Sequence, residues 1–75
     1  EWLFIRFKAE EIETVENFFS SPVQFRKDDI DGYYIAKVFT TIDTSLVGWL
    51  FINRKKIEII APSNLKNLFS QTDKA

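Results

Sequence analysis

The sequence contains no cysteine and no histidine among its 75 residues. Without cysteine the chain has no disulfide bonds and no thiolate metal sites. Without histidine it lacks the commonest general base and the commonest metal ligand. Its two glycines are too few for a loop that cradles phosphates. We therefore predict that the chain is not an enzyme and has no catalytic, cofactor-binding or metal-binding residues.

Long apolar runs and an unbalanced charge are also missing. Ten basic and eleven acidic residues leave a net charge of -1, which gives no indication of nucleic-acid binding. No apolar run approaches the roughly 20 residues that a membrane-spanning helix needs, so we expect no membrane association. The chain contains no methionine. We expect residues 1–75 to form a single domain from the C-terminal end of a longer cytoplasmic protein.

Hydrophobic residues, in contrast, make up 45% of the chain, and they include eight phenylalanines. Their spacing changes along the sequence. Residues 2–8 alternate as in a strand, and residues from Ala9 follow a helical period that ends at Ser20-Ser21-Pro22. A second helix is expected from Ser45 to about Asn53, capped by Asp43 or Thr44. Gly48 inside this helix costs roughly 1 kcal/mol relative to alanine, and we expect it to permit close packing on the sheet.

A hairpin is predicted between the two helices, with strands at residues 23–27 and 33–41. Asp31-Gly32 is typical of a two-residue turn, because a type I′ turn needs positive φ at both positions. That turn would pair Ile30 with Tyr33, Phe25 with Val38, Arg26 with Lys37, and Gln24 with Phe39. A longer loop through Asp28-Asp29 would flip this pairing.

The last strand is expected at residues 57–61, before Pro62, followed by a short helix from Ser63 that carries Leu65, Leu68 and Phe69. Residues 71–75 are expected to be frayed. The order βαββαβ predicts an α+β fold, the ferredoxin-like split βαβ sandwich, in which two helices cover one face of a four-stranded antiparallel sheet. The expected core is Leu3, Ile5, Phe7, Ile12, Val15, Phe19, Phe25, Val38, Trp49, Leu50 and Ile59.

This fold leaves the second face of the sheet open. With the pairing above, the open face combines apolar and basic side chains, which is typical of an interaction surface. The basic groups could instead contact the phosphates of an effector, or be ordinary solvated charges. The candidate interface residues are Phe4, Arg6, Arg26, Ile35, Lys37, Phe39 and Ile60.

Two resemblances bear on function. Leu3-Phe4-Ile5 resembles the start of the first ribonucleoprotein motif of RNA-recognition domains, and Gly32-Tyr33-Tyr34 resembles the second. Such motifs stack bases on exposed rings. Asp31 stands where that motif has a basic residue, and Ile35 stands where it has a stacking ring. Binding of single-stranded nucleic acid is therefore the alternative function.

The second resemblance covers residues 3–69. It is carried by Ile5-Arg6-Phe7, by Gln24 eight residues before Gly32, by Trp49-Leu50, and by Ile57-Glu58-Ile59-Ile60-Ala61-Pro62 before Leu65. This order resembles the C-terminal extension that follows the WYL domain in bacterial transcription regulators, often called the WCX domain.

The second resemblance implies a non-catalytic module of a transcriptional regulator. The partners it implies are a second protomer and the WYL domain of the same protein. The module would contribute to dimer assembly and border the effector site, where effectors include nucleic-acid fragments. DNA would be bound by a missing N-terminal winged-helix domain.

Overall fold

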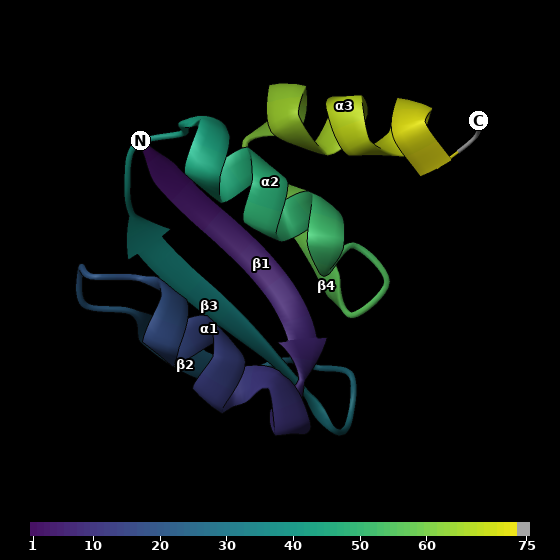
Figure 1. Ribbon diagram of the computed structural model, residues 1–75. Helices are drawn as coiled ribbons and strands as arrows, with labels where there is room; N and C mark the ends of the chain where they lie inside the picture. Colours follow the sequence, from purple (N-terminus) through teal and green to yellow (C-terminus); the bar gives the residue numbers. More distant parts are fainter. Residues whose placement is uncertain (74–75) are drawn as a thin grey trace.

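A computed structural model describes residues 1–73 (Figure 1). In chain order the elements are β1 (Trp2–Lys8), the 3-10 helix η1 (Ala9–Glu11), α1 (Ile12–Phe18), β2 (Gln24–Lys27), β3 (Tyr33–Phe39), α2 (Thr44–Ile52), β4 (Ile57–Ala61) and α3 (Ser63–Asp73). Within this range, no helix is long and apolar enough to cross a membrane.

The four strands form one sheet in the order β2-β3-β1-β4, and every neighbouring pair is antiparallel. β3 therefore lies between β1 and β2, and β1 lies between β3 and β4, so each βαβ unit is split by a strand of the other. In Figure 1, α1 and α2 lie on the same side of the sheet, and α3 lies beyond α2. The predicted ferredoxin-like split βαβ arrangement is confirmed.

The core lies between the sheet and the helices. β1 is an inner strand, and its alternate residues Leu3, Ile5 and Phe7 are fully buried. Of the predicted core residues, the buried ones are Leu3, Ile5, Phe7, Val15, Val38, Leu50 and Ile59. The partly buried ones, which pack against this core, are Ile12, Phe19, Phe25 and Trp49.

Trp49 lies at the rim of the core, where α2 meets the end of α1. Its ring stacks on Phe18 with centroids 4.3 Å apart and an interplanar angle of 12°. Phe19 approaches it edge-on at 5.6 Å. Trp49 therefore joins the two helices and does not fill the centre of the core.

Helix α2 begins at Thr44 because Asp43, one of the two expected caps, accepts a hydrogen bond of 2.9 Å from the Leu46 N–H. Its buried residues are Leu46 and Leu50. The expectation for Gly48 was wrong: a Cβ atom built on this residue meets nothing within 4 Å, so it makes no close contact with the sheet. At 100° per residue, Gly48 lies on the side of the helix opposite Leu46 and Leu50.

The hairpin loop is longer than the predicted two-residue turn. The Asp28 N–H donates to the Tyr33 carbonyl at 3.0 Å, and the Tyr33 N–H donates to the Ile30 carbonyl at 3.1 Å. Gly32, at the end of the loop, has a φ of 84°. The observed pairs are Gln24 with Lys37, Phe25 with Ala36, Arg26 with Ile35, and Lys27 with Tyr34.

The predicted register was therefore wrong by two residues. Because a shift of two returns each side chain to the same face of a strand, the predicted faces survive. Phe25 still faces the core, and Arg26 still faces the open side.

Helix α3 continues to Asp73, so residues 71–73 are helical where the sequence suggested a frayed end. Leu65 and Phe69 are buried, whereas Leu68 is 49% exposed. Lys74 and Ala75 lie outside the described residues. The ring of Phe69 lies 6.4 Å from that of Phe51, which places α3 next to the end of α2.

Candidate interaction surface

The uncovered face of the sheet carries the side chains that alternate with those of the core. Arg6 pairs with Ile35 across β1 and β3, and Ile35 pairs with Arg26 across β3 and β2, so the three share this face. On the other edge the register shifts, which leaves Ile60 and Ala61 opposite Phe4. The structure places all of the candidate interface residues on this open face: Phe4, Arg6, Arg26, Ile35, Lys37, Phe39 and Ile60.

Four of the open-face side chains touch one another where β1 begins and β3 ends. Trp2 pairs with Phe39, and Phe4 pairs with Lys37. The Trp2 and Phe39 rings meet edge-on with centroids 5.1 Å apart. The Lys37 ammonium lies 4.6 Å from the centre of the Trp2 ring and 5.9 Å from that of Phe4. We call Trp2, Phe4, Lys37 and Phe39 the aromatic cluster.

The aromatic cluster is the main exposed apolar area of this face. Trp2 is 45% exposed and Phe39 is 58% exposed. Ile35, which the sequence suggested as an interface residue, is only 7% exposed. Trp2 was absent from the sequence-based candidates, although its alternation with Leu3 already put it on the same face as Phe4.

Arg6 has two carboxylate partners within the domain. Its Nε donates to Oδ2 of Asp28, and its Nη1 lies 3.4 Å from both carboxylate oxygens of Glu58. The hydrogen bond to Asp28 raises the pKa of Arg6, so the guanidinium stays charged. Arg6 is the strand partner of Ile35 on β3, and Asp28 follows β2 on the far side of β3, so the ion pair between Arg6 and Asp28 spans β3.

Arg26 and Lys37 differ from Arg6. Arg26 is exposed on β2, and within residues 1–73 it makes no side-chain hydrogen bond or ion pair. The Lys37 ammonium lies near the Trp2 and Phe4 rings and has no ion pair among the described residues. Of the three predicted basic interface residues, Arg26 and Lys37 lie on neighbouring strands without a carboxylate partner among the described residues, and Arg6 is already neutralised.

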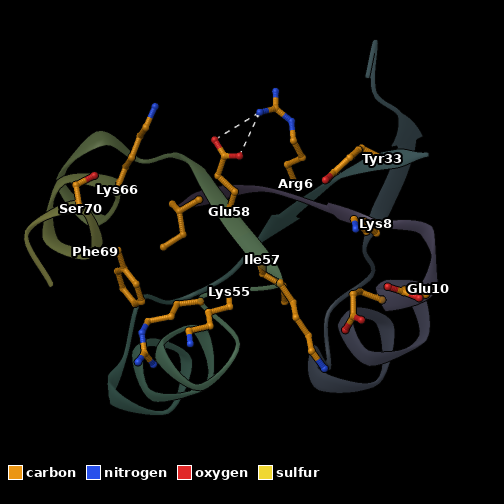
Figure 2. A pocket seen from close by; sticks show the side chains of 14 residues that line it. Arg6, Lys8, Glu10, Tyr33, Lys55, Ile57, Glu58, Lys66, Phe69 and Ser70 are labelled. Carbon is orange, nitrogen blue, oxygen red and sulfur yellow. Dashed lines mark hydrogen bonds and ion pairs between the residues drawn. The ribbon is translucent and has the colours of Figure 1, made fainter. Parts of the chain in front are cut away.

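A hollow of about 690 Å³ lies along the β4 edge of the domain. Figure 2 shows Arg6 bonded to Glu58 at its rim, and the Lys66 side chain extending away from Lys55. Glu10 and Lys8 also line it, so both charge signs are present. Among the described residues, no group of three His, Cys, Asp or Glu side chains could hold a metal ion. Its lining carries six basic and three acidic side chains, so the hollow has an excess of positive charge; the basic ones are Arg6, Lys8, Arg54, Lys55, Lys56 and Lys66.

Comparisons of this chain with protein-family models, curated proteins and solved structures found no match.

Proposed function

We propose that this domain is a non-catalytic interaction module whose open sheet face packs against a neighbouring protein domain. The aromatic cluster is the observation that supports this function. Trp2 and Phe39 expose about half of their surface at one end of the open face, near the basic side chains of Arg26 and Lys37. Aromatic residues with a polar rim are enriched at the centres of protein interfaces.

The resemblance to the WCX extension gives this module a context. In that context the neighbouring domain is the WYL domain of the same cytoplasmic regulator, and the regulator binds DNA through a separate N-terminal domain. Arg26 and Lys37 would then lie at the edge of the effector site, where their charges are available for the phosphates of a nucleic-acid effector. A Trp-Tyr-Leu-type strand pattern in the protein sequence upstream of Glu1 would support this assignment.

The geometry of the aromatic cluster favours a protein partner over single-stranded nucleic acid. Bases stack on the open faces of aromatic rings beside basic groups. Here the Lys37 ammonium lies over a face of the Trp2 ring, and Phe39 packs against Trp2 edge-on. Arg6 is bound to two carboxylates. A base would have to displace Lys37 before it could stack on that face of Trp2.

Calorimetric titration of this chain into the upstream part of its own regulator, produced separately, tests the proposal. We expect Phe39→Glu to weaken the association at least about tenfold, because it buries an unpaired carboxylate in an apolar contact. Ile30→Glu is the matched control, since Ile30 is 49% exposed but lies in the hairpin loop. Equal losses for the two variants, or no loss for Phe39→Glu, would contradict the proposal.

Two further measurements separate the finer assignments. Arg26→Glu combined with Lys37→Glu should weaken the response of the complete regulator to its effector while the fold survives. Titration of the isolated chain with single-stranded oligonucleotides at low and moderate salt tests the alternative. Tight binding that falls steeply with salt, and that Phe4→Ala abolishes, would favour nucleic-acid recognition.

A further inference from the structure

Helix α2 has apolar side chains on every side, although only one side meets the core. Leu46 and Leu50 are buried against the sheet. On the opposite side, Ile52 is 79% exposed. Phe51 is 42% exposed, with its ring 6.4 Å from that of Phe69 and the Arg54 guanidinium 4.2 Å from its centre. A helix that is apolar all round is normally buried all round. The outward side of α2 is therefore only partly covered, and Ile52 is its most exposed apolar side chain.

Gly48 lies at the centre of this outward side. Thr44, Gly48 and Ile52 are spaced four residues apart and form one line along the helix, directly opposite Leu46 and Leu50. Gly48 is exposed and has no positive φ, so an alanine would fit both its backbone and its surroundings. Glycine weakens a helix relative to alanine, and no contact among the described residues requires a glycine at position 48. An external backbone that approaches the helix closely at this point does explain it.

We propose that the outward side of α2 packs against the same surface of a second copy of this chain, with the two helices antiparallel and crossing at Gly48. We call this surface the α2 outer face; it consists of Thr44, Ser45, Gly48, Phe51 and Ile52. All five residues are exposed. The interface is two-fold symmetric, so one patch serves both partners.

The shape of the α2 outer face is complementary to itself. In an antiparallel crossing at Gly48, Ile52 of one copy lies opposite Thr44 of the other, and Phe51 lies opposite Ser45. Large side chains at one end of the helix therefore meet small ones at the other end. Gly48 faces its own counterpart at the centre, where the two backbones come closest.

The charges at the ends of α2 favour the same arrangement. Asp43 precedes the helix, and Arg54, Lys55 and Lys56 follow it. An antiparallel pair brings Asp43 of each copy next to the basic residues of the other, and it opposes the two helix dipoles. A parallel pair would instead place six basic side chains together. This complementarity between the two ends indicates a second copy as the occupant.

The α2 outer face points away from the sheet, so this contact is independent of the partner proposed for the open face. The helix has nine residues and is about 14 Å long, so two such helices bury only a small area. Because stable interfaces are larger, we expect the dimer to be weak. We therefore expect association of the whole chain to become visible only at high concentration.

Sedimentation equilibrium between about 10 µM and 1 mM tests the contact, because this range covers dissociation constants of weak interfaces. We expect a monomer–dimer equilibrium in which Ile52→Glu raises the dissociation constant at least about tenfold. Ile30→Glu, the same change at an exposed isoleucine far from α2, should leave it within about twofold. Circular dichroism of each variant verifies that the fold is retained.

Gly48→Ala provides the sharper test, because its two expected effects have opposite signs. In the dilute monomer it should raise the melting temperature by about 4–8 °C, since alanine stabilises the helix. In the dimer its methyl group keeps the two backbones apart, so the dissociation constant should rise. A chain that is monomeric at every concentration would overturn the proposal. The proposal would also be overturned if neither Gly48→Ala nor Ile52→Glu raised the dissociation constant of the dimer. It would be overturned as well if Phe39→Glu, on the open face, raised it.

Discussion

Replacement of Trp49 by alanine tests how the two helices are held together on the sheet. Truncation of a fully buried tryptophan or phenylalanine costs about 3–5 kcal/mol. Trp49 is only partly buried, so we expect a smaller loss in the free energy of unfolding, of about 2–3 kcal/mol. The ring pairs with Phe18 and Phe19 account for about 1–2 kcal/mol of this loss. The domain should remain folded, because its total stability is on the order of 5 kcal/mol.

Urea unfolding followed by circular dichroism measures this loss. With a slope near 1 kcal/mol per molar, the midpoint should fall by about 2–3 M with an unchanged slope. Trp49→Phe is the control, since it keeps an apolar ring next to Phe18 and should lose less than about half as much. If the alanine variant lost no more stability than the phenylalanine variant, the stacked rings would not join the two helices as described.

Two further substitutions test the hairpin loop. Asp28→Asn should lower stability by about 0.5–1 kcal/mol at low salt and by less at high salt, because it weakens the ion pair with Arg6. Asp29→Asn is its control, since only the backbone of Asp29 bonds to Asp28, and equal losses would contradict the pairing. Gly32→Ala should cost about 1–2 kcal/mol in urea unfolding, because Gly32 has a φ of 84°; an unchanged midpoint would show that the loop adopts another conformation.

The elements and their faces were predictable because each carries a strong local period. The alternation of Leu3, Ile5 and Phe7 identifies an inner strand, and the spacing of Leu46 and Leu50 identifies the buried side of α2. The same spacing already placed Gly48 on the outside. The expectation that Gly48 packs on the sheet therefore overlooked a signal that was present in the sequence.

The hairpin register was not predictable in the same way. Asp31-Gly32 is a strong local turn signal, but the loop begins at Asp28, whose carboxylate bonds to Arg6 on β1. That contact joins residues 22 positions apart, so no local pattern contains it. The same contact removes Arg6 from the set of available cations on the open face, which spacing alone could not show.

The two tryptophans lie on different sides of the domain, so their intrinsic fluorescence reports separately on contacts at the sheet and at the helices. Trp2 is 45% exposed on the sheet side, whereas Trp49 is partly buried and packs against the rings of Phe18 and Phe19 on the helix side. A molecule that covers the open face should shift and quench the Trp2 emission and leave that of Trp49 unchanged. In the Trp49→Phe variant all remaining tryptophan fluorescence comes from Trp2, so contact at the sheet can be followed without any attached label.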